Sequence, residues 1–356
     1  MALTKVSPEI LDLNNTAGTS NLRLGVNAGN SIESGGNYNV VVGDEAGTAI
    51  TTGDNNVAVG YQSLDANTTG SRLTAVGNEA LSANITAAFN VAVGDRALLT
   101  NTGSSNNVAV GANALYTFNV GSGDGYNVAV GKNAGLSVTT GHTNTLIGGL
   151  AGDAITTGSG NTFIGFESGS YGTNLTTGTT NTLVGAYNNT TAVNSVNAMG
   201  LGYNLDCAGG YTTVGSGSAE IRAPHGSAAW ATASDQRYKK DIVDSTAGLS
   251  FINALQPRTF KYKTLGELPE TFSAYEADST EVFKNSETNH GFIAQEVKAA
   301  IDADASIKDG FRLWDDREDG SQEVAEAALI PVLVKAIQEQ NALITALTAR
   351  VAELEG

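Results

Sequence analysis

The 356-residue chain is poor in several residue types on which common folds and active sites depend. Its single cysteine, Cys207, excludes an intrachain disulfide, and its small or apolar neighbours favour a buried side chain over a nucleophile or metal ligand. His, Cys and carboxylate residues nowhere show the spacing of a metal site, so we expect neither a metal ion nor a cofactor. No apolar run approaches the roughly 20 residues that cross a bilayer, and we expect no membrane insertion.

Charged residues make up only 15% of the chain, and 36 Asp and Glu against 19 Lys and Arg give a formal net charge of −17. A nucleic-acid partner is not expected, because such proteins carry a basic surface. The first residues lack the long apolar stretch and the small-residue cleavage site of a secretory signal. We therefore expect synthesis in the cytoplasm without export by a signal peptide.

Proline is absent between Pro8 and Pro224, and a repeat rich in Gly, Asn and Thr fills this stretch. An apolar-x-apolar-Gly core, as in Val57-Ala58-Val59-Gly60, recurs every 17 residues with two steps of 20. Each copy predicts a short strand whose large apolar residues face one way, followed by a glycine that permits a positive φ. An Asn often precedes the strand, and stacked Asn side chains form amide ladders between neighbouring turns.

A coil of this length cannot bury its own apolar face, so the coils are expected to stack. The sequence thus predicts a mainly β fold, a β-solenoid or β-roll rod over residues 22–215. A segment at 1–21 precedes the rod and a linker at 216–233 follows it. At about 4.8 Å per rung, roughly eleven coils give a rod about 50 Å long. The core Asn56-Val57-Ala58-Val59-Gly60 resembles the head repeats of trimeric autotransporter adhesins, which implies three chains packed side by side.

The pattern changes at Ser234, after which charges become dense. Apolar spacing predicts a helix over 243–254, alternation predicts a strand over 258–262, and residues 291–297 read as a strand entering a helix. Residues 264–288 are polar and predict a long loop or hairpin, and the acidic residues 315–320 predict an exposed turn. We expect a small α+β domain over 234–322.

A coiled-coil helix is predicted at 323–356. Its heptad a positions are Ile330, Ile337, Ile344 and Val351, and its d positions are Leu333, Gln340, Leu347 and Leu354. The pattern is short and does not decide between a dimer and a trimer. Pro331 is tolerated in a first turn but would kink a helix that began near Glu323. A single amphipathic helix packed on its own domain is the alternative.

Four blocks occur in order in this part of the chain. They are Ser234-Asp235-x-Arg237-x-Lys239-x-Asp241-Ile242, Leu255-x-Pro257 before Phe260-x-Tyr262, Gly291-Phe292-Ile293-Ala294-Gln295-Glu296-Val297, and Leu329 to Glu339. Together they resemble the intramolecular chaperone domain of phage tail fibres and tailspikes, the self-cleaving domain of endosialidases and related fibres. This resemblance implies a homotrimer that guides fibre assembly and a Ser–Lys dyad that then releases the domain.

A Ser–Lys dyad can cleave a peptide bond only if its lysine acts as a base. A serine hydroxyl is a weak nucleophile until a base takes its proton, and a lysine is that base only when neutral. We assign Ser234 as the nucleophile and Lys239 as the base, with the cut between Ala233 and Ser234. Their spacing does not place them on one face of a regular helix, so the pair needs a turn or an intersubunit arrangement.

Four further residues are candidates for supporting roles: Asp235, Arg237, Lys240 and His290. Arg237 and Lys240 are possible neighbouring cations for the lysine. His290 is either structural or close to the site. In the alternative interpretation, Ser234 or Asp235 simply caps the following helix, with Arg237 and Lys239 solvated.

The sequence as a whole predicts a phage tail fibre, located in the virion and made in the host cytoplasm. Its partners would be two further copies of the chain, other tail proteins through the N-terminus, and a host cell-surface receptor, either a glycan or a protein. A tailspike glycosidase is one alternative, but it needs two carboxyls about 5–10 Å apart and the repeats carry only scattered acids. A cellular trimeric adhesin is another, disfavoured by the missing signal peptide and membrane anchor.

Overall fold

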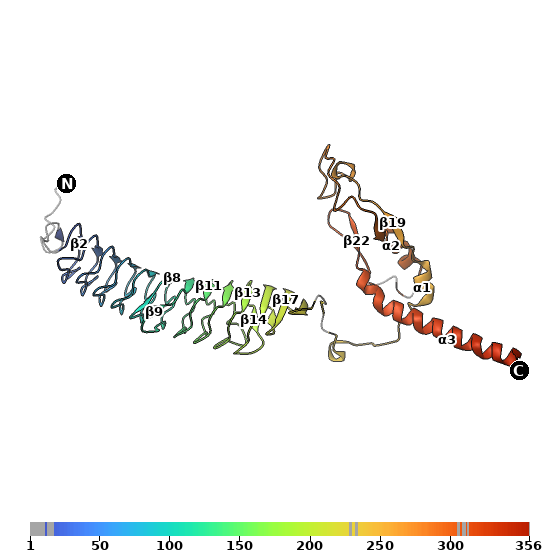
Figure 1. Ribbon diagram of the computed structural model, residues 1–356, viewed down its shortest axis with the longest axis horizontal. Coiled ribbons are helices and arrows are strands. Elements are labelled where there is room, and N and C mark those ends of the chain that lie inside the picture. Colours follow the sequence, from blue (N-terminus) through green and yellow to red (C-terminus); the bar gives the residue numbers. More distant parts are fainter. Residues whose placement is uncertain are drawn as a thin grey trace. The chain divides into compact units, whose positions relative to one another are not determined.

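The computed structural model describes residues 11–12, 18–227, 230–231, 234–304, 307, 311 and 313–355. The chain divides into two compact units, one ending at Ser234 and one beginning at Asp235 (Figure 1). The first is a β-solenoid, and the second is a small α+β unit that ends in a long helix. The mainly β fold class predicted from the repeats is confirmed.

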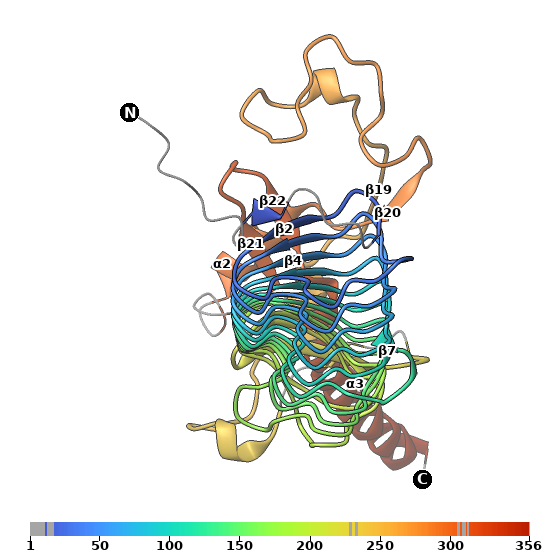
Figure 2. The ribbon, with the colours of Figure 1, turned by 90° about the vertical axis from the view of Figure 1, so that its left-hand side faces the viewer.

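One sheet runs the length of the solenoid and takes one short strand from each coil (Figure 2). Its parallel strands are β2 (Leu22–Leu24), β3 (Val40–Val42), β4 (Val57–Val59), β5 (Thr74–Val76), β6 (Val91–Val93), β8 (Val108–Val110), β10 (Val128–Val130), β11 (Thr145–Ile147), β12 (Thr162–Ile164), β13 (Thr182–Val184), β15 (Met199–Tyr203) and β17 (Tyr211–Ser216). Equivalent repeat positions pair in register, as Ala75 does with Ala58 and Ala92.

Antiparallel strands close both ends of this sheet. β1 (Leu11–Asp12) pairs with β2, and β18 (Ala219–Pro224) pairs with β17. Such caps satisfy backbone groups that an open edge would present to other chains. Two smaller parallel pairs lie outside the main sheet: β7 (Ser104–Ser105) with β9 (Gly123–Asp124), and β14 (Asn189–Thr190) with β16 (Asp206–Cys207).

The middle residue of each central strand points into the solenoid, and its two neighbours point outward. Ala58 is fully buried, whereas Val57 and Val59 on either side of it are only half-buried. The large apolar residues do face one way, as the alternation predicts. However, stacking of the coils does not bury that face, because the interior of this coil takes the small residue Ala58 instead.

The interior volume of a coil is shared between the strand and the turn that follows. Where the strand contributes Ala92, the turn contributes a buried Leu98 held at a φ of 52°. Where the strand contributes Phe163, the turn contributes Gly169, and a Cβ atom on this glycine would overlap the phenylalanine ring. In each of these two coils one large side chain occupies this level of the core, contributed by the turn in the first and by the strand in the second.

Buried asparagines connect the coils, and this confirms the predicted amide ladder. The Oδ1 atom of each accepts a hydrogen bond of 2.8–3.1 Å from the backbone N–H of the equivalent Asn one coil later. The continuous ladder runs through Asn90, Asn107, Asn127, Asn144, Asn161 and Asn181, all fully buried. Leu73 takes the place of an Asn between Asn56 and Asn90 and interrupts the ladder.

The second unit combines helices of very different length with two antiparallel strand pairs. Its helices are α1 (Leu249–Ala254), α2 (Ala294–Ala303) and α3 (Leu329–Glu355), with 3-10 turns η1 (Gln236–Tyr238), η2 (Leu265–Glu267) and η3 (Glu326–Ala328). β19 (Arg258–Phe260) pairs with β20 (Asn289–Gly291), and β21 (Trp314–Asp316) pairs with β22 (Gln322–Val324). Its core contains Ala247, Phe251, Leu255, Val297, Ile301, Leu313, Leu329 and Val332.

The elements of this unit differ from the expected ones in three places. The helix predicted over 243–254 forms only as α1. Of the acidic segment 315–320 predicted as an exposed turn, Asp315 and Asp316 belong to β21, and residues 317–320 lie in the connection to β22. The C-terminal helix begins at Leu329 rather than near Glu323, so Pro331 lies in its first turn and no kink is needed.

α3 is 27 residues long, but only residues near its N-terminus belong to the core of the unit. Leu329, Val332 and Ala336 are buried, whereas the apolar heptad positions are exposed along the helix. Exposed fractions at these positions are 62% for Ile330, 42% for Leu333, 56% for Ile337, 54% for Ile344, 64% for Leu347, 43% for Val351 and 81% for Leu354. Packing on its own domain therefore explains the burial of the first turns of α3. It does not bury the row of apolar heptad residues, which we call the heptad seam.

Within the ranges that the structure describes, none of the helices is long and apolar enough to cross a membrane.

Candidate functional site

The segment with the predicted nucleophile and base lies where the two compact units meet in sequence. Ser234 is the last residue of the first unit, and Lys239 and Lys240 belong to the second. All three residues are exposed in the single chain. Ala233, on the other side of the predicted cut, lies outside the described residues.

A 3-10 turn, η1, separates Ser234 from Lys239. The backbone N–H of Tyr238 donates to the carbonyl of Asp235 at 3.1 Å, and that of Lys239 donates to the carbonyl of Gln236 at 3.0 Å. Lys239 ends the turn in an extended conformation, with φ −116° and ψ 146°. Residues 236–238 between Ser234 and Lys239 therefore form a turn and not a regular α-helix.

Asp235 caps this turn and binds Arg237. Its carboxylate accepts the Arg237 backbone N–H at 2.8 Å, and the guanidinium donates through Nε at 3.0 Å and Nη2 at 2.7 Å. The side-chain hydrogen bonds from Arg237 are the main cause that lowers the pKa of Asp235, and the same contact raises the pKa of Arg237. Because the charge of Arg237 is compensated within the turn, Lys240 is the better candidate for a cation that acts on Lys239.

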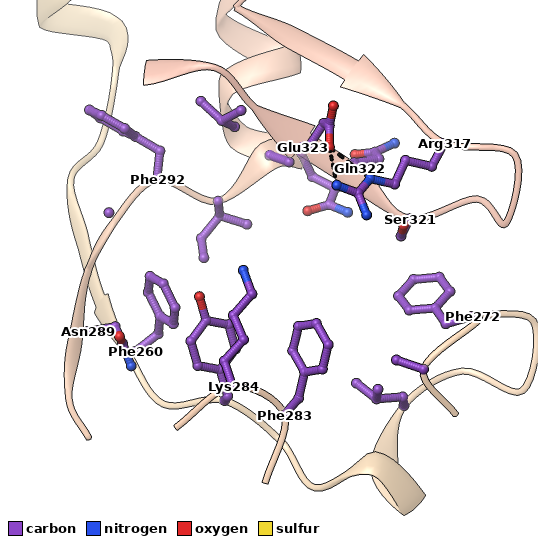
Figure 3. A pocket seen from close by; sticks show the side chains of 18 of the residues that line it. Phe260, Phe272, Phe283, Lys284, Asn289, Phe292, Arg317, Ser321, Gln322 and Glu323 are labelled. Carbon is purple, nitrogen blue, oxygen red and sulfur yellow. Dashed lines mark hydrogen bonds and ion pairs between the residues drawn. The ribbon is translucent and has the colours of Figure 1, made fainter. Parts of the chain in front are cut away.

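His290, the remaining supporting candidate, is exposed on β20 and pairs with Thr259 of β19. It belongs to the lining of a pocket of about 770 Å³ within the second unit (Figure 3). The aromatic part of this lining consists of Phe260, Tyr262, Phe272, Phe283 and Phe292. The Nζ atom of Lys284 lies 5.3 Å from the ring centre of Tyr262 and 5.5 Å from that of Phe283, a cation–π arrangement.

Sequence reasoning did not find this pocket. Phe260 and Tyr262 predicted a strand and part of one of the four blocks, and residues 264–288 predicted a long polar loop or hairpin, with no pocket between them. The signal available was the two phenylalanines, Phe272 and Phe283, within that otherwise polar segment.

Asp319 fastens the loop of the pocket to the β21–β22 hairpin. Its carboxylate accepts the backbone N–H of Ser273 at 3.0 Å and the N–H and hydroxyl of Ser321 at 2.9 and 2.6 Å. These bonds, that of the Ser321 hydroxyl first, hold the pKa of Asp319 well below its usual range. A second clamp joins β19 to α2, where Arg258 donates to both carboxylate oxygens of Glu296 at 3.0 and 2.8 Å.

α3 is tied to α1 by a carboxylate. Oε2 of Glu339 accepts the backbone N–H of Leu249, the first residue of α1, at 2.8 Å. A negative charge at this end of a helix satisfies a free N–H and matches the helix dipole. The helix that carries the heptad seam is therefore fixed to the short helix that follows the candidate cleavage segment.

Several acids of the solenoid, on which a glycosidase would depend, are engaged with neighbouring coils. Glu45 accepts a hydrogen bond from Gln62 at 2.7 Å, and Glu79 one from Arg96 at 2.8 Å. Burial raises the pKa of Asp65. In the part of the chain that the structure describes, no group of three or more His, Cys, Asp or Glu residues could hold a metal ion.

Residues 234–305 match a family described as the chaperone of endosialidase. The matched region begins at Ser234 and spans η1, α1, β19, β20 and α2. Comparisons with curated proteins and with solved structures found no match. The chain thus joins a β-solenoid body to a C-terminal segment similar to the chaperone of endosialidase, an arrangement that fits a tail fibre or tail spike with an intramolecular chaperone.

Proposed function

We propose that the chain is a phage tail fibre that assembles as a homotrimer with the help of its C-terminal unit and then cleaves itself between Ala233 and Ser234. The solenoid, residues 22–215, is the part that binds the host surface, and residues 1–21 attach it to other tail proteins. Residues 216–233 are the linker to the cut, 234–322 the chaperone and autoprotease domain, and 323–356 the segment whose helix α3 forms a coiled coil. The mature fibre belongs to the virion.

One observation carries this proposal: the family match begins at Ser234, and the compact units part between Ser234 and Asp235. A cut before Ser234 leaves the solenoid with its closing strand β18, and leaves the core around Phe251 and Val297 intact in the released part. Neither product loses a structural element, as a maturation cleavage requires.

The reaction starts when the Ser234 hydroxyl attacks the carbonyl carbon of Ala233. The new C–O bond forms, the C–N bond to Ser234 breaks, and the nitrogen leaves as an amine, so that an ester replaces the amide. Water then hydrolyses the ester and frees the carboxylate of Ala233. Lys239 takes the hydroxyl proton and passes it to the leaving nitrogen, and the turn held by Asp235 and Arg237 connects the base to the nucleophile.

Lys239 must be uncharged to act as a base, and it is exposed in the single chain. Burial of the segment in the trimer and the charge of Lys240 both favour the neutral amine. Cleavage would then wait for assembly, so the chaperone unit is not lost before the fibre has formed.

The test compares the wild-type chain with Ser234→Ala and Lys239→Met on a denaturing gel. Ser245→Ala serves as the control, since Ser245 is exposed in the same segment, and Lys240→Met tests the neighbouring cation. We expect two fragments from wild type and Ser245→Ala, an intact chain from the two dyad variants, and slower cleavage in Lys240→Met. Mass spectrometry should find fragment ends at Ala233 and Ser234. A wild-type chain that stays whole refutes the self-cleavage, and a cut elsewhere refutes Ser234 as nucleophile.

A further inference from the structure

Four aromatic side chains gather on the surface of the solenoid in its C-terminal half. Phe166 and Tyr171 follow β12, Tyr187 follows β13, and Tyr203 ends β15. The ring centre of Tyr187 lies 5.5 Å from that of Phe166, 5.0 Å from that of Tyr171 and 5.6 Å from that of Tyr203, each pair edge to face. We call these four residues the aromatic cluster. It forms one patch of rings across three successive coils.

Backbone hydrogen bonds between the coils hold the rings at fixed heights. The N–H of Tyr187 donates to the carbonyl of Phe166 at 2.9 Å. One coil later, the equivalent N–H of Asn204 donates to the carbonyl of Ala186 at 3.0 Å. The ring of Phe166 also lies against Gly149 of the coil before, where a Cβ atom would meet it at 3.4 Å. A ligand would thus bind a surface that is already ordered, which lowers the entropy cost of binding.

The aromatic cluster is open to solvent. The exposed fraction is 45% for Phe166, 47% for Tyr171 and 53% for Tyr203, and Tyr187 at the centre is half-buried. None of the three tyrosine hydroxyls forms a hydrogen bond with another residue in the described part of the chain. The cluster therefore presents apolar ring surface and unused hydroxyl groups side by side.

The aromatic cluster departs both from the repeat and from the acidic character of the chain. In several earlier coils the two positions after the glycine hold polar or charged residues, such as Asp44-Glu45, Asn78-Glu79 and Asp95-Arg96. Between Lys132 and Asp206 the sequence has only two charged residues, Asp153 and Glu167. A contact along the whole rod would recur in every coil, whereas this group of rings occurs once. Its place in a nearly uncharged stretch suits a local site for an uncharged ligand.

We propose that the aromatic cluster binds an uncharged saccharide chain. This inference rests on the host-surface binding of the proposed function, and it names the site and the class of receptor. A pyranose ring presents apolar C–H groups on its faces and hydroxyls at its edge, which match the rings and hydroxyls of the cluster. The rungs of the solenoid are about 4.8 Å apart, close to the length of one sugar unit in an extended chain. Neighbouring sugars can therefore contact the rings of successive coils.

Polar side chains suited to sugar hydroxyls lie beside the rings. Glu167 and Asn204 occupy, in the coils before and after, the position that Tyr187 has in its own coil, and all three residues have a left-handed φ of 52–59°. A carboxylate accepts hydrogen bonds from hydroxyls, and an amide both donates and accepts them. An apolar protein surface would leave these groups and the tyrosine hydroxyls without partners, which is unfavourable. The mixture of groups therefore favours a saccharide over such a surface.

The test measures binding of the full-length protein to hexasaccharides by saturation-transfer difference NMR. The uncharged probes are maltohexaose, cellohexaose and the hexamers of galactose, mannose, rhamnose and N-acetylglucosamine, and a hexamer of sialic acid is the anionic probe. We expect wild type to bind at least one uncharged probe, and Tyr203→Ala and Phe166→Ala to bind it about tenfold more weakly. Tyr61→Ala is the matched control and should bind as wild type does. Like Tyr203, Tyr61 directly follows the glycine of its coil, and it is 48% exposed outside the cluster.

Two further variants separate contact with a ring from general apolar contact. Tyr203→Phe keeps the ring and should bind about threefold more weakly, because one hydrogen bond is lost. Tyr203→Leu keeps apolar bulk without the ring and should bind about tenfold more weakly. Light scattering and urea unfolding of the same preparations establish that each variant assembles and folds as wild type does.

Several outcomes would overturn the proposal. A wild type that binds none of the uncharged probes refutes the saccharide, and one that binds only the sialic acid hexamer refutes the uncharged ligand. Equal binding by wild type and the cluster variants, or an equal loss in Tyr61→Ala, refutes the cluster as the site. A lower molar mass in the cluster variants assigns the rings to a contact between copies. A wild type that stays uncleaved or monomeric refutes the proposed cleavage or assembly, and the saccharide measurement stands apart from it.

Discussion

The side-chain oxygen of Asn144 accepts two hydrogen bonds from Asn161 in the next coil, one from its backbone N–H at 3.0 Å and one from its side-chain amide at 3.1 Å. The Asn144 amide in turn donates to the carbonyl of Gly158 at 3.0 Å and to Oδ1 of Asn127 at 3.2 Å. One buried side chain thus links three successive coils. The ladder adds directional bonds to a stack whose apolar contacts are nearly the same at every rung.

Asn144→Ala should destabilise the solenoid by about 2–4 kcal/mol, since it leaves the N–H of Asn161 and the carbonyl of Gly158 buried without their partner. We expect a lower urea midpoint in circular dichroism. The control is Asn78→Ala, whose exposed amide binds only Asp95 in the described contacts. This change should stay within about 0.5 kcal/mol of wild type. Equal losses in the two variants would contradict a special role for the ladder.

The packing of Gly169 in the turn against Phe163 in the strand can be tested with a double-mutant cycle. Gly169→Ala places a methyl group against the ring of Phe163 and should cost about 1–3 kcal/mol from overpacking, beyond the backbone strain at its positive φ. In the Phe163→Ala background the ring is gone, so the same glycine change should cost less. Urea unfolding of the four proteins gives the coupling.

Gly121→Ala is the matched control for backbone strain. Gly121 has a φ of 76°, close to the 78° of Gly169, and a Cβ atom there would meet nothing within 4 Å. The difference between the two alanine variants therefore isolates the contact with Phe163. If both glycine changes cost the same in either background, the interior does not limit side-chain size as the structure indicates.

The repeat predicted the solenoid because its physical basis is local. The glycine after the strand triplet, and the Asn that precedes it in most copies, lie within one coil, and the 17-residue period appears on comparing neighbouring coils. Which side chains of each strand triplet face the interior could not be predicted in the same way. Whether Val57 or Ala58 points inward depends on how much room the closed coil leaves, and other buried side chains of the coil, such as Leu64 and Asn67, take part of that room.

The candidate site, too, could be predicted only in part from the sequence. The sequence located the segment around Ser234 and proposed Asp235 as a possible cap, which the structure supports. It did not foresee that Arg237 binds Asp235, since the pairing depends on the 3-10 turn between them. Contacts between distant segments, such as Glu339 with Leu249, have no local signature at all.

Cys207 should be unreactive in the folded protein. Burial raises the pKa of its thiol from 9.0 to about 12, so almost no thiolate is present at pH 8. We expect negligible reaction with an aromatic disulfide reagent at pH 8 and full reaction in denaturant. Because folding raises this pKa, the contribution of the neutral thiol to stability is complete below pH 9 and declines as the pH rises toward 12. Fast reaction of the native protein would contradict this burial.

Asp319 should control how firmly the loop that contains Ser273 is held to the β21–β22 hairpin. Folding lowers the pKa of this carboxyl, so the ionised form stabilises the contact at every pH above its ordinary range and the effect is lost only as the pH falls through the lowered pKa. Between pH 4 and pH 7 the loop should stay attached. Asp319→Ala removes three acceptor contacts and should speed amide exchange at Ser273, measured by hydrogen–deuterium exchange, without changing the exchange of α2. Asp316→Ala, a change at an exposed acid of the same hairpin, should leave Ser273 as it is. Protection of Ser273 that is unchanged in Asp319→Ala, or equally lost in Asp316→Ala, would show that another contact holds the loop.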